Sequence, residues 1–378
     1  MEFQDKIFRH NLIKAYRIIL AIALVAAVAV AIKIRSDSRV YSRSELVQRM
    51  EKPGSVDSIY GHVGENLLCY SMDGVSAYDK NGSQLWNQTY QMQNAMVDIA
   101  GSYVAAADYQ GTKIYLCGPG GLQGTIDTSV PILAVRVSEK GMVMAQLLDG
   151  DTVFLRMYSA DGTLITNFRT TMRNFGYPAG FCISPDNTKV GVAFMKAVSG
   201  QVATSVAFYN FTGVGQNETD NLVSAYECED ETVPYITFLD DETAVSAGNK
   251  KIRIFSGKQK PVLKQEIETQ REIKAIYTGK GSFVTVNDSD GSGYDFHVYD
   301  KAGNEKLSFN ADFEYTDVYV DEGRILVYNQ TRFKMVGFNG VVKYDGELSG
   351  GILKVIPVDR YASFLVVYDD KMERVRLR

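Results

Sequence analysis

The feature that most constrains this chain is a repeated unit of an apolar segment, an aromatic residue and a tight polar turn. The unit recurs seven times after residue 55, with its aromatic residue at Tyr78, Tyr115, Tyr158, Tyr209, Phe255, Tyr299 and Phe338. The intervals between these residues lie between 37 and 51 and average about 43. A period of about 40–45 residues with four short strands per unit is typical of the blades of a β-propeller.

The segments between the turns are apolar on both sides, as the strands of stacked blades must be. Examples lie at residues 66–70, 189–194, 282–286 and 324–328. One four-stranded sheet cannot bury both of its faces alone, but sheets arranged around an axis cover one another. We therefore predict an all-β fold, a β-propeller over residues 55–378. The repeats favour eight blades, and seven blades with irregular ends is the alternative.

The predicted blades differ at the end of the chain. They span residues 55–90, 94–127, 131–170, 178–228, 233–268, 272–310, 313–347 and 351–378. The last has room for only three strands, and its Tyr368 is in phase with Tyr328 in the second strand of the preceding unit. Closing the ring therefore needs a strand from the N-terminal side, which we expect around residues 38–41.

Two segments resemble the repeats of known propeller families. Residues 73–86 (DGVSAYDKNGSQLW) resemble the repeat of quinoprotein-dehydrogenase-like propellers, and residues 183–193 (ISPDNTKVGVA) resemble the strand–turn–strand of WD-type propellers. The first resemblance implies a quinone and calcium held at the axis by acids and an Arg, but we cannot place that set here. Trp86 is the only Trp in the chain, so we expect it to pack between blades. Both likenesses argue for the fold rather than a function.

An apolar segment precedes the repeats. Residues 18–32 (IILAIALVAAVAVAI) carry no charged or polar side chain, and residues 15–34 reach the ~20 residues that span a bilayer. We predict a transmembrane helix over residues 15–34 that contacts the lipid bilayer as an uncleaved signal anchor. A cleaved signal peptide is the alternative, because Ala29-Val30-Ala31 resembles a cleavage site.

The residues around this span predict its topology. Residues 1–14 form a basic cytoplasmic tail, and the cations before the span slightly outnumber those that follow it closely. This asymmetry favours an N-terminus inside the cell and a C-terminal domain outside. Residues 35–54 are expected to form a stalk with a short helix at about 43–51, and a local helix packed on the underside of the domain is the alternative. Ser42 and Glu45 have the spacing of a capping box, and Pro53-Gly54 ends the run.

The whole layout consists of a basic tail, one apolar span, a stalk and a propeller-like ectodomain. It resembles an uncharacterised family of single-pass membrane proteins from Gram-positive bacteria that carries a domain-of-unknown-function label. The resemblance covers nearly the full chain and rests on architecture. It implies no activity.

One acidic segment is a candidate calcium loop. Residues 287–295 (NDSDGSGYD) alternate carboxylates with glycines, and hard oxygen ligands at this spacing suit Ca²⁺. Position 12 of such a loop, counted from Asp288, is Tyr299 instead of the bidentate Glu. A solvated hairpin turn is therefore the favoured interpretation.

The spacing of the cysteines and histidines favours structural roles over metal binding or catalysis. The cysteines are Cys69, Cys117, Cys182 and Cys228, and their spacing disfavours zinc. We expect the first two to be small buried residues, and whether the last two form a disulfide stays open. His62 and His297 are isolated, so a local surface or core role is favoured over catalysis.

Two further patterns predict exposed loops. The sequons begin at Asn81, Asn87, Asn210, Asn217, Asn287 and Asn329, and we expect all of them in turns. The acidic run at residues 227–231 (ECEDE) is expected to be a solvated loop, with a cation or partner patch as the alternative.

The sequence carries no recognisable catalytic motif. The sequence contains no nucleophile elbow, zinc-protease motif or phosphate-binding loop. Its net charge of −5 gives no nucleic-acid-binding footprint. We assign no catalytic, cofactor-binding or metal-binding residue and expect no cofactor.

The expected function is a membrane-tethered extracytoplasmic module that binds or scaffolds an envelope protein or glycan. A quinone- or calcium-dependent propeller enzyme and a secreted propeller released by signal cleavage are the alternatives.

Overall fold

The computed structural model describes residues 16–28, 35, 37–168, 176–198, 200–228, 231–321, 323–359 and 362–378. Residues 16–28 are helical and solvent-exposed. Among the residues described, no helix combines the length and apolar character needed to cross a membrane. The predicted tail at residues 1–14, and residues 15 and 29–34 of the predicted span, lie outside the described residues.

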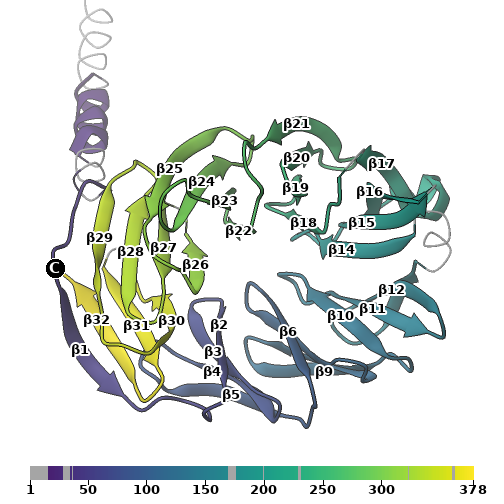
Figure 1. The fold of residues 1–378 in the computed structure, drawn as a ribbon, viewed down its shortest axis with the longest axis horizontal. Helices are drawn as coiled ribbons and strands as arrows, with labels where there is room; N and C mark the ends of the chain where they lie inside the picture. The colour runs from purple at the N-terminus through teal and green to yellow at the C-terminus, as the bar shows by residue number, and fades with distance from the viewer. Residues whose placement is uncertain are drawn as a thin grey trace, which may run out of the picture.

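The rest of the chain forms eight four-stranded antiparallel sheets around an axis (Figure 1). Blade 1 consists of β2 (Ile59–Val63), β3 (Asn66–Tyr70), β4 (Gly74–Tyr78) and β5 (Gln84–Thr89), and blade 2 consists of β6 (Ala95–Ala100), β7 (Tyr103–Asp108), β8 (Lys113–Gly118) and β9 (Gly121–Asp127). Blade 3 consists of β10 (Ile132–Val137), β11 (Val143–Asp149), β12 (Thr152–Tyr158) and β13 (Leu164–Asn167). Blade 4 consists of β14 (Tyr177–Ile183), β15 (Lys189–Val198), β16 (Gln201–Asn210) and β17 (Leu222–Cys228). Two short 3₁₀ turns, η1 (Gly215–Asn217) and η2 (Thr219–Asn221), precede β17.

The second half of the chain repeats the same order. Blade 5 consists of β18 (Tyr235–Phe238), β19 (Thr243–Ala247), β20 (Lys251–Ser256) and β21 (Val262–Glu268), and blade 6 consists of β22 (Ala275–Gly279), β23 (Ser282–Asp288), β24 (Tyr294–Asp300) and β25 (Glu305–Ala311). Blade 7 consists of β26 (Asp317–Val320), β27 (Arg324–Tyr328), β28 (Arg332–Gly337) and β29 (Val342–Glu347). Blade 8 consists of β30 (Ile352–Pro357), β31 (Ser363–Tyr368), β32 (Met372–Leu377) and β1 (Ser44–Met50). The prediction of an all-β, eight-bladed propeller is therefore confirmed.

The repeated aromatic residues mark the third strand of blades 1–7. Six of them lie in that strand, as Tyr78 does at the end of β4, and Phe338 directly follows β28. Close to these residues the pairing of the third with the fourth strand shifts register, for example between Ala77 and Tyr78 or between Val298 and Tyr299. Such bulges bend and twist the outer strand. The sequence repeat is thus the signature of a bulged third-to-fourth-strand hairpin.

The ring is closed by a strand from the N-terminal side of the repeats, as predicted, but not by the predicted residues. β1 pairs with β32 in antiparallel register, with Ser44 opposite Leu377 and Met50 opposite Met372. The predicted stalk helix at 43–51 is therefore wrong, and the closing strand begins after residues 38–41. The free edge of β32 supplies hydrogen-bond partners to this segment, and a local capping signal cannot reveal such a distant partner.

The hydrophobic core lies between the blades. Buried clusters join blades 1 and 2 at Leu68 and Val104, blades 2–4 at Leu116, Phe154 and Tyr209, blades 4 and 5 at Phe208 and Phe255, blades 5 and 6 at Ile254 and Phe283, blades 6 and 7 at Phe296 and Ile325, blades 7 and 8 at Tyr328 and Phe364, and blades 8 and 1 at Leu365 and Leu67. Every blade thus covers its neighbours, which is how thin sheets become stable.

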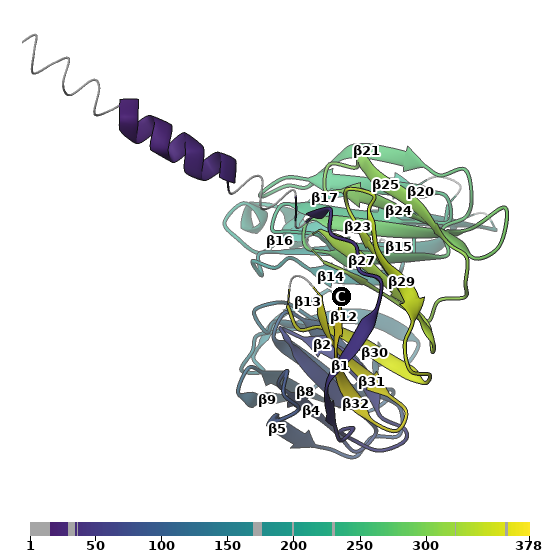
Figure 2. The same ribbon diagram turned by 90° about the vertical axis from the view of Figure 1, so that its left-hand side faces the viewer.

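The N-terminal segment reaches the ring on one identifiable face. We call this the near face, because β1 starts there, beside Arg378; it carries the turns between the first and second and between the third and fourth strands. The carbonyl of Asp37 accepts a hydrogen bond from Asn339 Nδ2 at 3.0 Å, and Tyr41 is buried between blades 7 and 8. The helix of residues 16–28 projects away from the ring (Figure 2). From residue 37 onward the predicted stalk is therefore bound to the propeller.

Candidate functional site

The first strands of the blades, which surround the axis, are mostly apolar. Among these described strands, five residues are Asp, Glu, His, Lys or Arg: His62, Asp98, Arg136, Asp317 and Lys354. They form two groups, Asp98 with Arg136 on blades 2 and 3, and the other three on blades 1, 7 and 8. Charged groups on strands that line an opening are where a propeller can recognise a ligand.

An axial pocket of about 430 Å³ lies against β6, β10, β14 and β18. Its apolar walls include Phe181 and Ile236, and its polar lining includes Asp98, Arg136 and Gln146. The lining also includes residues 138–139 of a first-to-second-strand turn, so the pocket reaches toward the near face. Its volume falls in the range of about 300–1,000 Å³ that is typical of ligand sites.

The polar centre of this axial pocket is an ion pair between neighbouring blades. Arg136 Nη1 lies 3.5 Å from Asp98 Oδ1, and the Val137 backbone N–H donates to Asp98 Oδ2 at 2.7 Å. Burial raises the pKa of the Asp98 carboxyl, although Arg136 and the Val137 amide act in the opposite direction. The Arg136 guanidinium also lies over the Phe181 ring at 5.7 Å and is half exposed. It is therefore available to a partner.

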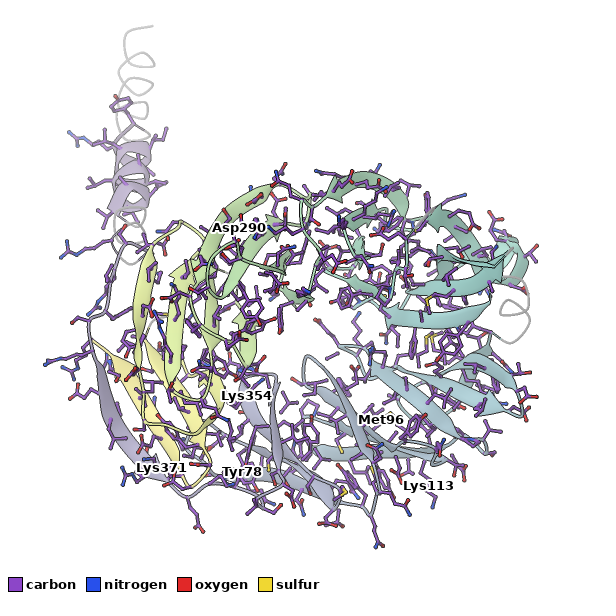
Figure 3. The ribbon with its side chains drawn as sticks, in the orientation of Figure 1. Tyr78, Met96, Lys113, Asp290, Lys354 and Lys371 are labelled. Atoms are coloured by element: carbon purple, nitrogen blue, oxygen red, sulfur yellow. The ribbon has the colours of Figure 1, made fainter. Side chains whose placement is uncertain are left out.

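The second charged group joins blades 7 and 8. Lys354 Nζ lies 2.6 Å from Asp317 Oδ2, and the Tyr328 hydroxyl donates to the same oxygen at 2.8 Å. Figure 3 places Lys354 toward the centre of the ring, whereas Lys113 and Lys371 lie at its periphery. The Val318 backbone N–H donates to Asp317 Oδ1 at 2.8 Å, so three donors hold this carboxylate, which suits a structural contact.

His62 is packed beside this second group. Its ring stacks on Tyr319 at a centroid distance of 4.8 Å. Burial, together with the nearby Lys354 ammonium, lowers the pKa of His62 to about 4. The ring is therefore neutral near pH 7. This packing agrees with the predicted local role of His62, in the surface or the core.

A second cavity of about 480 Å³ lies between the outer parts of blades 5 and 6. We call it the side cavity, and define it by Gln265, Arg271, Asp295, His297 and Glu305. His297 is isolated in the sequence, but in the fold its Nδ1 lies 3.1 Å from Glu305 Oε1.

The acidic segment at residues 287–295 forms the hairpin between β23 and β24, as the favoured interpretation predicted. Lys274 Nζ lies 3.1 Å from Asp288 Oδ2, and Arg271 pairs with the carboxylates of Asp290 and Asp295. Among the residues described, no group of three or more His, Cys, Asp and Glu side chains has the arrangement of a metal site.

Trp86, Cys69 and Cys117 pack as the sequence predicted. Trp86 packs on the cluster between blades 1 and 2. All four cysteines are buried free thiols. The disulfide between Cys182 and Cys228, which the sequence left undecided, is therefore not formed. Burial raises the pKa of the Cys117 thiol to about 11 and that of Cys182 to about 12.

Two loop predictions are wrong for particular residues. Glu231, at the end of the acidic run, is buried, and its Oε2 lies 2.8 Å from Arg253 Nη1. Asn210 and Asn287 are buried in strands, and Asn87 lies in β5 at an exposed position instead of in a turn. A sequon or an acidic run reports local composition and not the hydrogen-bond partners that the ring supplies.

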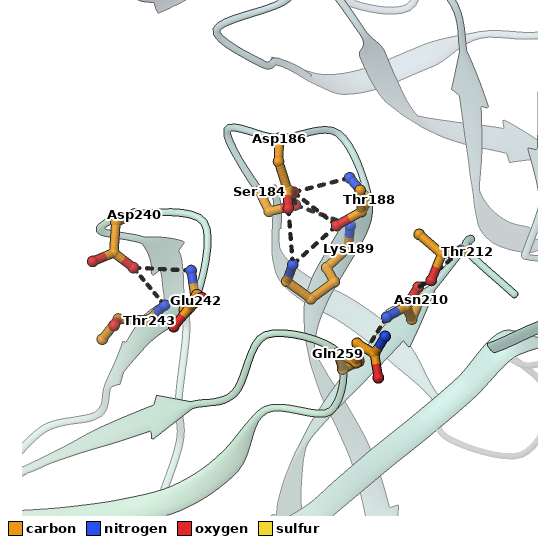
Figure 4. A network of polar contacts seen from close by, with 10 residues as sticks. All are labelled: Ser184, Asp186, Thr188, Lys189, Asn210, Thr212, Asp240, Glu242, Thr243 and Gln259. Atoms are coloured by element: carbon orange, nitrogen blue, oxygen red, sulfur yellow. Dashed lines mark hydrogen bonds and ion pairs between the residues drawn. The ribbon is translucent and has the colours of Figure 1, made fainter. Parts of the chain in front are cut away.

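The WD-like segment forms a polar network on the near face of blade 4 (Figure 4). Lys189 is fully buried, and its Nζ donates to Asp186 Oδ2 at 3.2 Å and to Thr188 Oγ1 at 2.9 Å. Asn210 Nδ2 donates to the carbonyl of Gln259 in blade 5 at 2.7 Å. These bonds tie turns together, so we assign this network a structural role.

The comparisons with known proteins place the chain in a family. A model described as "Family of unknown function (DUF5711)" matches residues 37–377. The chain belongs to the DUF5711 family. No curated protein sequence is similar to this DUF5711 chain.

Solved structures similar to this DUF5711 chain include three proteins. Sqt1 of Saccharomyces cerevisiae has a TM-score of 0.53 and 11% identity, over 90% of this chain and 99% of Sqt1. AztD of Citrobacter koseri has a TM-score of 0.53 and 8% identity, over 78% and 87%. Hsv2 of Kluyveromyces lactis has a TM-score of 0.52 and 8% identity, over 77% and 98%. At such low identity these likenesses show the fold alone.

The axial charges were missed in the sequence of this DUF5711 chain. Asp98 and Arg136 are single charged residues inside short apolar segments, which is the signal that could have singled them out. A charged residue in the first strand of a blade lies beside the axis, so the position of that strand must be known before such a residue can be assigned to the axis. The information that the sequence did not supply was which segment of each repeat forms the first strand.

Proposed function

We propose that this protein is a membrane-tethered extracytoplasmic propeller that binds or scaffolds an envelope protein or glycan. The observation that carries the proposal is the axial pocket, with its apolar walls and the half-exposed Arg136. A rigid ring that presents such a pocket suits recognition. Apolar walls around one ion pair favour a protein segment with an apolar and a charged side chain as the occupant.

The arrangement of the axial charges favours binding over quinoprotein-like chemistry. An enzyme of that kind gathers several carboxylates and an Arg at one end of the axis. Here Asp98 pairs with Arg136 on blades 2 and 3, and Asp317 pairs with Lys354 on blades 7 and 8. The two carboxylates thus serve separate contacts between blades.

The tether is the second part of the proposal. Residues 15–34 cross the membrane of a Gram-positive bacterium, with the N-terminus in the cytoplasm and the propeller outside. The apolar sequence and the projecting helix of residues 16–28 support this arrangement. Protease added to intact cells should remove the propeller and leave a membrane-bound stub. Release of a soluble domain that starts near Ile32 would instead establish signal cleavage.

The binding proposal is tested by cross-linking and capture of the full-length protein from envelope membranes. Arg136→Ala and Asp98→Asn should each reduce recovery of one defined envelope component at least tenfold, because they alter the charged centre of the axial pocket. Lys113→Ala, a change at the exposed periphery, is the matched control and should recover it fully. Equal recovery by all variants would place the partner elsewhere and contradict the proposal.

A further inference from the structure

The side cavity is built from hydrogen-bonding groups on two blades. Asp295 and His297 are two residues apart in β24 and therefore lie on the same face of the strand. Both line the cavity. The outer strand β21 of blade 5 contributes Gln265 and Glu268, and Glu305 begins β25. The volume of about 480 Å³ is large enough for a small ligand.

The cavity holds more hydrogen-bond acceptors than cations to satisfy them. Three carboxylates line it, those of Glu268, Asp295 and Glu305, against the single guanidinium of Arg271. That guanidinium already donates to the Asp288 carbonyl and pairs with Asp290 and Asp295. A ligand that fits must therefore bring donors, and an acidic ligand would meet uncompensated negative charge.

His297 adds a group that can accept or donate. Its Nδ1 lies 3.1 Å from Glu305 Oε1, and this contact orients the ring. With Nδ1–H donating to the carboxylate, Nε2 has a lone pair for a ligand hydroxyl. Both side chains are partly exposed, at 33% for His297 and 44% for Glu305, so a ligand can reach them.

One further acceptor lies in the same wall. Asn287 is buried, and its Nδ2 donates to the carbonyls of Arg271 and Glu272. Its Oδ1 has no hydrogen-bond partner among the residues described. A buried carbonyl oxygen without a donor is costly to the fold.

We propose that the side cavity is a binding site for a neutral saccharide. Sugar hydroxyls donate and accept at close spacing, and so can serve the carboxylates, the amide of Gln265 and the His297 ring together. This inference concerns a different cavity from the axial pocket and does not depend on the membrane tether. It adds a second, small-molecule specificity to the ring.

The test is calorimetric titration of the full-length protein in lipid nanodiscs, because maltoside detergents would themselves supply a sugar. Glucose, galactose and N-acetylglucosamine are the neutral probes, and glucuronate and spermidine are the charged probes. At least one neutral sugar should bind, and glucuronate should bind at least tenfold more weakly than that sugar. Failure of every neutral sugar, or preference for glucuronate or spermidine, would overturn the proposal.

Variants then assign the binding to this cavity. Glu305→Gln and His297→Gln should each weaken binding of the neutral sugar about tenfold, the change expected from the loss of one charged or buried hydrogen bond. Glu218→Gln, on an exposed loop of blade 4, is the matched control and should bind as the wild type does. Equal affinity in all three variants would show that the sugar binds elsewhere and would overturn the assignment.

Discussion

At the residue scale, burial determines the role of each charged side chain in this ring. Glu231 and Arg253 have side chains only 7% and 5% exposed, and they face each other at 2.8 Å. Glu231 Oε1 also accepts hydrogen bonds from the backbone N–H groups of Lys250 and Lys251. This carboxylate therefore joins the loop before β18 to the hairpin between β19 and β20.

Removing this carboxylate should destabilise the fold. Glu231→Ala leaves the buried guanidinium of Arg253 with Glu266 as its remaining partner and leaves two backbone donors unpaired. We expect a loss of about 3 kcal/mol in the free energy of unfolding, measured by urea denaturation. Glu218→Ala, at an exposed position, should cost less than about 0.5 kcal/mol. A loss of similar size in both variants would contradict the structural role of Glu231.

Asp300 predicts a pH dependence with a defined sign. Burial alone would raise the pKa of its carboxyl, but the Lys306 ammonium and the donors of Asn304 outweigh burial and lower it from 3.8 to about 2. The ionised form is therefore favoured in the folded state. Its contribution to stability is present above the unfolded pKa and is lost as the pH falls toward 2.

Replacing Asp300 with Asn tests this sign. Asp300→Asn keeps the shape of the turn but removes the charge, and should cost about 1 kcal/mol at pH 7. The difference from the wild type should shrink as the pH falls from 4 to 2 in urea denaturation series. Asp57→Asn, on an exposed loop, is the control and should show no such trend. A difference that grows on acidification would contradict the assignment.

The roles of individual residues were harder to predict from the sequence than the strands or the fold. The burial of Cys69 and the packing of Trp86 follow from their apolar surroundings. The partners of Glu231 and the meeting of His297 with Glu305 depend on strand pairing that no local pattern shows.

At the element scale, the ring depends on one strand that is distant in sequence from its partners. β1 completes blade 8 by pairing with β32, and residues 42–43 and 378 exchange backbone hydrogen bonds at its start. The outward side chains of β1 are exposed, including Leu46 at 50% and Val47 at 55%. Its contribution is therefore made mainly through the backbone ladder.

Disrupting β1 should open blade 8 selectively. Replacing residues 44–50 with a Gly/Ser sequence should speed amide hydrogen exchange along β32 at least tenfold, because its outer edge loses its partner. Mass spectrometry of peptides that cover residues 372–377 measures this change. The double variant Leu46→Ser/Val47→Ser changes exposed side chains alone and should leave the exchange unaltered. Unchanged exchange in the Gly/Ser variant would contradict closure by β1.

The elements themselves were largely predictable. The aromatic residue before each turn is a local signal, because the bulge and the hairpin recur in the same place in successive blades. The segment at 44–50 lacks that signal and carries a capping-box spacing. Its strand conformation comes from β32, more than 300 residues away, so sequence reasoning predicted a helix there.

At the scale of the whole molecule, the N-terminal segment is attached to one face of the ring. Asp37 and Tyr41 bind the propeller directly, and in sequence Asp37 follows closely after the proposed span over residues 15–34. In the proposed arrangement the near face is turned toward the membrane, and the far face, with its second-to-third-strand turns, is turned away. The axial pocket, which reaches toward the near face, is then approached from the membrane side.

A pair of labels on one blade tests this orientation most directly. Ala302→Cys lies in a near-face turn of blade 6, and Gly291→Cys lies in a far-face turn of the same blade; both positions are exposed. The four native thiols are buried, and burial raises their pKa, so a maleimide dye reacts selectively with the introduced cysteine.

The decisive measurement is the quenching of these dyes by spin-labelled lipid headgroups, with the full-length protein in nanodiscs. We predict stronger quenching at position 302 than at position 291. Equal quenching at both positions, or stronger quenching at position 291, would contradict a propeller held with its near face toward the bilayer.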